Sequence, residues 1–207
     1  MSPRSTNRFA GGVLVLALLL SGCAGTPPLV DVSDGTKARA VDASTQRMFA
    51  RALDAMAKED WVTAEKSLLA VTNAVPELSS PWTNLGIVYL RTGRAAEAAS
   101  VLGIAIDHDP SDCPPRLVLA ELAERARDYQ KAREHYLACL EKEPDNRVAL
   151  VNLGIVQEIY LGDLPDALQR YEHYRDVEPG DEARVAAWIA DLSRRVDPQV
   201  VSAEGVR

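Results

Sequence analysis

A pattern of apolar and polar residues recurs along most of the chain and is clearest between Ser79 and Asp112. In this stretch two sets of apolar or small residues recur three or four positions apart, which places each set on one side of an α-helix. The sets are Trp82, Leu85, Gly86 and Tyr89, and then Ala98, Leu102 and Ala105. Gly93 between them suits a tight turn, and Pro110 ends the second helix. The pattern predicts two antiparallel helices whose apolar faces need neighbouring units to cover them.

The same pattern recurs before and after this stretch at an interval of 34 residues. Two series mark the interval: Pro76, Pro110 and Pro144, and Ala64, Ala98 and Ala132. The predicted units are residues 45–78, 79–112, 113–146 and 147–181. The first helix of the first unit has the weakest pattern, as expected of a terminal repeat. In the fourth unit one extra residue separates Gly154 from Gly162. It indicates either a harmless bulge or longer turn, or a kink with a function.

A last apolar stripe follows the fourth unit and consists of Val185, Trp188, Ile189 and Leu192. It predicts a helix over 182–196 that covers the last unit. The unit 79–112 resembles the tetratricopeptide repeat (TPR) at each signature position of that family. The resemblance implies an all-α fold: a TPR superhelix of about four helix-turn-helix repeats plus a C-terminal capping helix, over residues 44–196, with a concave inner face. We expect residues 197–207 to form a loose tail.

The N-terminus has the layout of an export signal. Residues 1–22 contain Arg4 and Arg8 and no acidic residue, and the apolar run at 9–20 is too short to span a bilayer. The following Leu20-Ser21-Gly22-Cys23 resembles the bacterial lipobox; the alternative is a plain signal peptide with an incidental cysteine. The resemblance implies that Cys23 carries acyl chains. Residues 24–43 contain two prolines and two glycines and show no sustained period, so residues 23–43 are expected to form the lipidated cysteine and a flexible tether. Because Ala24 stands where an aspartate would favour the inner membrane, the resemblance also implies the outer membrane, facing the periplasm.

Composition and motifs argue against nucleic-acid binding and catalysis. The chain has 23 basic and 30 acidic residues and a net charge of −7, whereas nucleic-acid binding requires clustered cations. The three histidines lie in different helices or turns, and the sequence has no HExxH, no Gly-x-Ser-x-Gly and no phosphate-binding loop. We therefore expect no enzyme activity, no cofactor and no small-molecule substrate.

Two of the cysteines allow different interpretations. His135 and Cys139 are four residues apart on one predicted helix and could form half of a metal site, but no second pair completes it. A core thiol and a surface histidine are the simpler interpretation. Cys113 and Cys139 are also candidates for a disulfide, because an exported protein folds in an oxidising space. Against that pairing, Cys139 occupies a packing position directed into the stack.

The resemblance also implies a ligand groove on the concave face of the first helices. Counting Ser79 as position 1 of its unit, that groove is lined by positions 2, 5, 6, 9, 12 and 13. The principal candidates are Phe49, Leu53, Asn84, Ile87, Arg91, Leu117, Glu121, Asn152 and Ile155. The two asparagines at position 6 either bond the backbone of a bound peptide or only stabilise neighbouring helices. With Arg91 as the one cation noted there, we expect an apolar or mildly basic partner segment.

The last third of the chain carries a second resemblance. The 43 residues from Leu153 to Arg195, which include the extra residue and the Trp-Ile-Ala-Asp-Leu-x-Arg-Arg run, are similar to TPR lipoproteins described as components of the TonB system. This resemblance implies a non-enzymatic interaction scaffold at the outer membrane that is accessory to TonB-type envelope transport. Its partners would be periplasmic or envelope proteins such as TonB, ExbB and ExbD. The alternative is a pilotin-like assembly factor for a type IV pilus or secretion channel.

Overall fold

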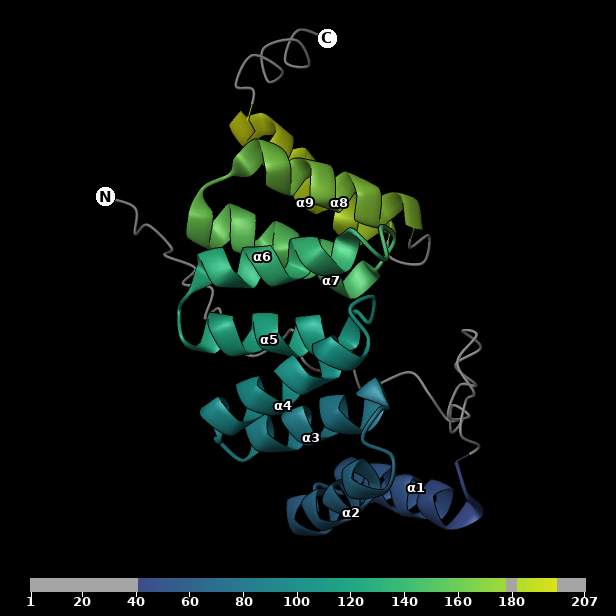
Figure 1. The fold of residues 1–207 in the computed structure, drawn as a ribbon. Helices are drawn as coiled ribbons and strands as arrows, with labels where there is room; N and C mark the ends of the chain where they lie inside the picture. The colour runs from purple at the N-terminus through teal and green to yellow at the C-terminus, as the bar shows by residue number, and fades with distance from the viewer. Residues whose placement is uncertain (1–40, 178–181, 197–207) are drawn as a thin grey trace, which may run out of the picture. The chain divides into compact units, whose positions relative to one another are not determined.

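The computed structural model describes residues 41–177 and 182–196 (Figure 1). The predicted signal peptide, Cys23, nearly all of the tether and the tail at 197–207 lie outside these residues. All regular structure in the described part is helical. The helices are α1 (Ala43–Ala57), α2 (Trp61–Ala74), α3 (Ser79–Arg91), α4 (Ala95–His108), α5 (Pro114–Arg125), α6 (Tyr129–Leu140), α7 (Arg147–Ile155), the π-helix η2 (Val156–Leu161), α8 (Leu164–Val177) and α9 (Glu182–Val196). No helix within these ranges is long and apolar enough to cross a bilayer.

The helices pack as successive pairs, one pair in each unit of the sequence pattern. Each first helix contacts its own second helix, and each second helix contacts the first helix of the next pair. The helix α9 packs on α8 and closes the series (Figure 1). Its Val185 and Leu192 are buried, whereas Trp188 is 37% exposed and its ring lies 5.7 Å from that of Tyr171. Contacts of this kind are local in sequence, so each pair is stabilised by its immediate neighbours.

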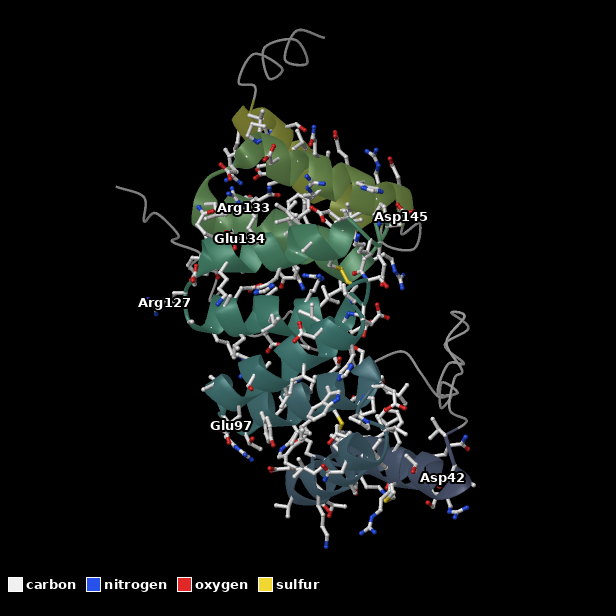
Figure 2. The ribbon with its side chains drawn as sticks, in the orientation of Figure 1. Asp42, Glu97, Arg127, Arg133, Glu134 and Asp145 are labelled. Atoms are coloured by element: carbon white, nitrogen blue, oxygen red, sulfur yellow. A yellow bond between two sulfur atoms is a disulfide. The ribbon has the colours of Figure 1, made fainter. Side chains whose placement is uncertain are left out.

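The turn inside each pair uses a residue in the left-handed region at one recurring position. These residues are Glu59 (φ 57°), Gly93 (φ 80°), Arg127 (φ 60°) and Gly162 (φ 75°). A left-handed residue ends the first helix and reverses the chain within a few residues. Only glycine adopts this conformation without steric cost, so the turns at Glu59 and Arg127 are strained relative to the other two. The Arg127 side chain projects outward from its turn (Figure 2).

Two glycines allow the paired helices to approach closely. A Cβ on Gly86 would lie 2.6 Å from the side chain of Leu102, and a Cβ on Gly154 would lie 2.5 Å from the ring of Tyr171. Both distances are far below van der Waals contact, so any larger residue would push the second helix away. The small residues in the pattern therefore mark helix contacts.

The extra residue of the fourth unit is accommodated as a π-helix. After α7 ends at Ile155, residues 156–161 form η2, and Gly162 then reverses the chain. A π-turn holds one more residue per turn than an α-turn, so the insertion is absorbed without breaking the helix. The side chain of Tyr160, which η2 carries, stacks on Tyr129 with ring centroids 4.0 Å apart. Ile159 beside it is 61% exposed.

Candidate functional site

One repeat position is half-buried in the first helix of all four units. This is position 9, and its residues are Leu53, Ile87, Glu121 and Ile155. Three of the four side chains are aliphatic. We call the stripe formed by positions 2, 5, 6, 9, 12 and 13 of the first helices the groove face. Leu117, at position 5 of α5, is half-buried as well, and Arg91 at the end of α3 is exposed. These six side chains retain surface that a partner could contact.

Two residues predicted to line the groove are instead buried. Phe49 and Asn152 are each only 6% exposed. The side chain of Asn152 is hydrogen-bonded to that of Tyr136. This contact favours the interpretation that Asn152 stabilises neighbouring helices over one in which it bonds a bound peptide. Asn84, by contrast, is half-buried, and its Nδ2 donates to the carbonyl of Ser80 at 2.9 Å. The two asparagines occupy equivalent positions but different environments. Position 24 of the preceding unit is Tyr136 for Asn152 and Leu68 for Asn84.

A repeated tyrosine–glutamate pair borders the groove face in the C-terminal half. Tyr136 donates its hydroxyl to Glu124 at 2.6 Å, and Tyr171 donates to Glu158 at 3.0 Å. The corresponding residues of the second unit are Leu102 and Leu90. Burial raises the pKa of both tyrosines far above the ordinary value. Burial also raises the pKa of Glu124, and the hydrogen bond from Tyr136 only partly offsets that effect.

Two arginines neutralise acidic groups on this face. Arg125 pairs with Glu121 at 2.6 Å, and its Nη1 also donates to the carbonyl of Leu90. Arg195, from α9, pairs with Glu158. Arg91 is therefore not the only cation on the groove face, since Arg125 occupies position 13 of its unit. The contact of Arg195 could not be read from the repeat pattern, because it depends on how α9 crosses the last pair.

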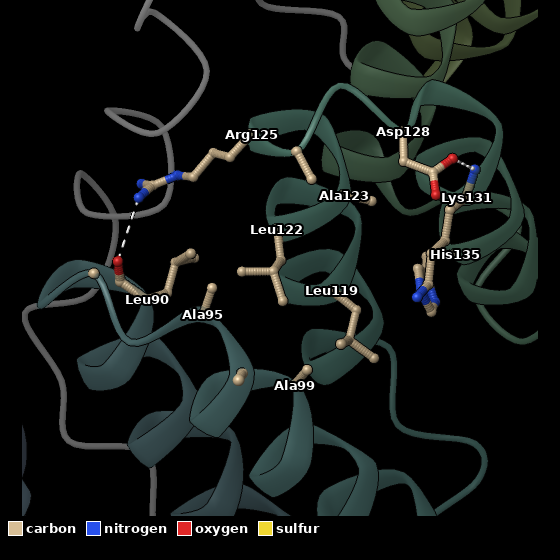
Figure 3. Close-up of a pocket in the computed structure, with 13 residues that line it drawn as sticks. Leu90, Ala95, Ala99, Leu119, Leu122, Ala123, Arg125, Asp128, Lys131 and His135 are labelled. Carbon is tan, nitrogen blue, oxygen red and sulfur yellow. Dashed lines mark hydrogen bonds between the residues drawn. The ribbon is translucent and has the colours of Figure 1, made fainter.

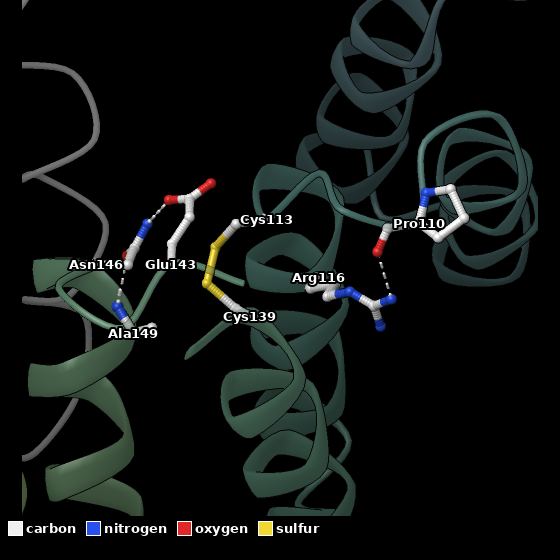
Figure 4. The surroundings of a disulfide bond; sticks show 7 residues. All are labelled: Pro110, Cys113, Arg116, Cys139, Glu143, Asn146 and Ala149. Atoms are coloured by element: carbon white, nitrogen blue, oxygen red, sulfur yellow. Dashed lines mark hydrogen bonds between the residues drawn. A yellow bond between two sulfur atoms is a disulfide. The ribbon is translucent and has the colours of Figure 1, made fainter. Parts of the chain in front are cut away.

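The third pair is closed by a disulfide. Cys113, the N-cap residue of α5, is bonded to Cys139 near the end of α6, with Cα atoms 4.8 Å apart (Figure 4). Both cysteines are fully buried. Antiparallel packing brings the start of one helix beside the end of the next, so a packing position does not prevent pairing, contrary to the objection from sequence. The bond also removes Cys139 as a thiolate ligand, which rules out the metal pair with His135 in this state. The described residues contain no cluster of three or more potential metal ligands.

Comparison with known proteins identifies the family. The family described as "Tetratricopeptide repeat" matches residues 49–112 and 117–175, so the chain belongs to the TPR family. None of the curated proteins matches it in sequence. The predicted fold class, an all-α TPR superhelix, is confirmed.

Solved structures share the fold at low sequence identity. A tetratricopeptide repeat protein from Parabacteroides merdae is 24% identical with a TM-score of 0.61, and the match covers 80% of this chain and 68% of that one. MamA from Desulfovibrio magneticus is 15% identical with a TM-score of 0.63, covering 80% and 92%. The first TPR of Spaghetti (RPAP3), bound to an HSP90 peptide, is 19% identical with a TM-score of 0.54, covering 57% and 97%. Members of the family are generally non-enzymatic scaffolds, and the TPR fold suggests a scaffold for protein–protein interaction.

Proposed function

We propose that this chain is a lipid-anchored scaffold of the outer membrane that holds an extended segment of a periplasmic protein on its groove face. The observation that carries the proposal is the row of half-buried aliphatic side chains at one repeat position, Leu53, Ile87 and Ile155. Regularly spaced apolar side chains on successive helices suit a ligand that runs across them in an extended conformation. The structural neighbour solved with an HSP90 peptide supports this mode of binding.

The charges on the groove face favour a segment that is largely apolar. Glu121 and Glu158 are already paired with Arg125 and Arg195, and Glu124 accepts a hydrogen bond from Tyr136. A basic residue of a partner would have to compete with these existing contacts. Arg91, which is exposed, is a free-standing cation at the edge of the aliphatic row. We therefore favour a partner segment with alternating apolar side chains and few charges.

The envelope role is supported by the two N- and C-terminal resemblances in the sequence. The lipobox-like residues before Cys23 support the membrane anchor, and the absence of Asp after it supports the outer membrane. The similarity of residues 153–195 to lipoproteins described as TonB-system components supports a partner among TonB, ExbB and ExbD. This stretch includes the extra residue, which is accommodated by the π-helix η2.

The proposal can be tested by crosslinking in intact cells with the lipidated chain as bait. We expect recovery of TonB, ExbB or ExbD, and recovery of a pilus secretin in their place would overturn the assignment in favour of a pilotin. The double variant Leu53→Gln/Ile87→Gln should reduce recovery at least tenfold. The matched control is Val62→Gln/Leu69→Gln, which changes two exposed aliphatic side chains of α2 outside the groove face and should leave recovery unchanged.

The membrane anchor is tested separately with Cys23→Ser. This variant should move the chain from the membrane fraction to the soluble periplasmic fraction. If the variant stays with the membrane, Cys23 is not the anchor, whatever the groove face binds.

A further inference from the structure

A cavity of about 550 Å³ lies between the second and third helix pairs (Figure 3). Its walls come from the end of α3, the start of α4, α5 and the start of α6. The apolar part of the lining includes Leu90, Ala95, Ala99, Leu119, Leu122 and Ala123. A cavity of this volume is within the range of sites that hold small ligands or single large side chains, about 300–1,000 Å³.

The cavity exists because the second unit carries small residues where its neighbours carry large ones. Positions 17 and 21 are Ala95 and Ala99 in the second unit. The corresponding residues are Trp61 and Glu65 in the first unit and Tyr129 and Arg133 in the third. Without an aromatic ring at the start of α4, nothing from that helix fills the space beside Leu119 and Leu122 of α5.

The cavity adjoins the groove face and shares Leu90 and Arg125 with it, but none of the position-9 side chains lines it. Successive residues of an α-helix are rotated by about 100°, so Leu119 lies about 160° around α5 from both Leu117 and Glu121, and Leu122 lies about 140° from Leu117 and about 100° from Glu121. Leu117 and Glu121 belong to the groove face, whereas Leu119 and Leu122 line the cavity. A ligand held on the position-9 row of the groove face therefore does not occupy the space beside Leu119 and Leu122.

Two cationic residues, Arg125 and Lys131, line the cavity, and Arg125 is also paired with Glu121 of the groove face. Lys131 and His135 are four residues apart on one face of α6, and both line the cavity (Figure 3). His135 Nε2 is buried without a hydrogen-bond partner among the described residues. Burial lowers the pKa of His135, and Lys131 and Arg116 lower it further, against a smaller opposing effect of Glu134.

The lining also contains one acidic residue, Asp128. Asp128 is the N-cap of α6, and its carboxylate accepts a hydrogen bond from the backbone N–H of Lys131 at 3.1 Å. That contact is a helix cap, so the carboxylate keeps its negative charge and offsets part of the charge of Lys131. The described part of the protein thus supplies no hydrogen-bond partner for the buried His135 Nε2. An acceptor group of a ligand in the cavity would satisfy this nitrogen when it carries the proton.

We propose that this cavity binds a second peptide segment, one with a large apolar side chain followed closely by a carboxylate. The apolar side chain would fill the space left by Ala95 and Ala99 against Leu119 and Leu122. The carboxylate would accept a hydrogen bond from His135 Nε2 and lie beside the ammonium group of Lys131. The apolar walls and the positive charge at one end match these two parts of the ligand. The chain thus has a second binding surface, formed by α4, α5 and α6, in addition to the position-9 row of the groove face.

The test is a selection of random heptapeptides displayed on phage against the purified full chain. Selected peptides are remeasured, as dye-labelled synthetic peptides, by fluorescence anisotropy on the wild type and on Ala95→Tyr. This substitution places at position 17 the residue that the third unit already carries there, so the repeat accommodates it. We expect a class of peptides whose affinity drops at least tenfold on Ala95→Tyr and about fivefold on Lys131→Glu, and which share an apolar residue followed by Asp or Glu. Ala187→Tyr, at an exposed position of α9, is the control and should leave the affinity of these peptides unchanged.

Three results would overturn the proposal. The selection could yield no peptide that is sensitive to Ala95→Tyr. It could instead yield sensitive peptides that lack an acidic residue, which would contradict the role of Lys131 and His135. Finally, extraction of the purified chain could release a fatty acid that is absent from Ala95→Tyr, in which case the cavity holds a lipid. The groove variant Leu53→Gln/Ile87→Gln should leave these peptides bound, so this test and that of the groove face fail independently.

Discussion

Breaking the bond between Cys113 and Cys139 should lower the free energy of unfolding by about 3.5 kcal/mol. The bond joins residues 26 apart in sequence and closes the third helix pair at the end where α5 begins and α6 ends. It lies in the middle of the series, where the pair has neighbours on both sides. A crosslink stabilises mainly by restricting the unfolded chain.

The magnitude follows from the length of the closed loop. For a loop of 26 residues, the entropy removed from the unfolded chain is about 12 cal/mol/K, which is about 3.5 kcal/mol at room temperature. With a urea dependence of about 2 kcal/mol/M, the midpoint of unfolding should fall by about 1.7 M when the bond is reduced. Because both cysteines are fully buried, reduction of the folded chain should be slow, and the protein must be unfolded in reductant first.

The assay is urea unfolding monitored by far-UV circular dichroism, with the chain oxidised or previously reduced. The double variant Cys113→Ala/Cys139→Ala is the control. Its midpoint should lie near that of the reduced wild type and should not respond to reductant. Equal midpoints for the oxidised and reduced wild type would refute the reasoning, since the unfolded chain would then gain no freedom from reduction.

Two further predictions concern the helix contacts and the buried carboxylate. Gly154→Ala should lower the free energy of unfolding by about 1–3 kcal/mol, because its Cβ would lie 2.5 Å from the ring of Tyr171. Gly103→Ala, whose Cβ would have nothing within 4 Å, should raise the free energy of unfolding by about 0.5–1 kcal/mol. Similar effects of the two variants in urea unfolding would contradict the close approach at Gly154. Burial raises the pKa of Glu124 above its ordinary 4.5, so the folded state binds the carboxyl proton more tightly than the unfolded chain does. The stability that results is complete below pH 4.5 and is lost as the pH rises through the folded-state pKa. Glu124→Gln removes this loss, so its melting temperature relative to the wild type should increase from pH 4 to pH 7.5, and a pH-independent difference would count against a buried, ionising Glu124.

The repeat pattern was sufficient to predict the helices because its cause is local. Gly93 and Pro110 mark a turn and a helix end wherever they stand, and residues such as Leu85 and Leu102 recur at a spacing that only an α-helix places on one side. The closing helix was predictable for the same reason. Its stripe ends in the buried Leu192, as the helical spacing requires.

The polar contacts of the candidate site were not predictable in the same way. Glu124 and Glu158 stand at equivalent positions, but nothing in their spacing shows that each accepts a hydrogen bond from the tyrosine twelve or thirteen residues later. The burial of Asn152, against the partial exposure of Asn84, depends on the side chain across the helix contact. The salt bridge from Arg195 to Glu158 joins residues 37 apart and requires the crossing of α9.

By itself, the sequence determined that this protein is a stack of helix pairs in the TPR family, because a 34-residue period of apolar, small and turn residues has one common structural solution. Only the tertiary structure decided how the insertion after Gly154 is absorbed, whether Cys113 meets Cys139, and where a hollow remains beside Ala95. Each of these depends on distances between segments that local spacing does not fix. A π-helix, a disulfide and a cavity all result from how neighbouring helices pack, since packing sets which atoms meet and which space stays unfilled.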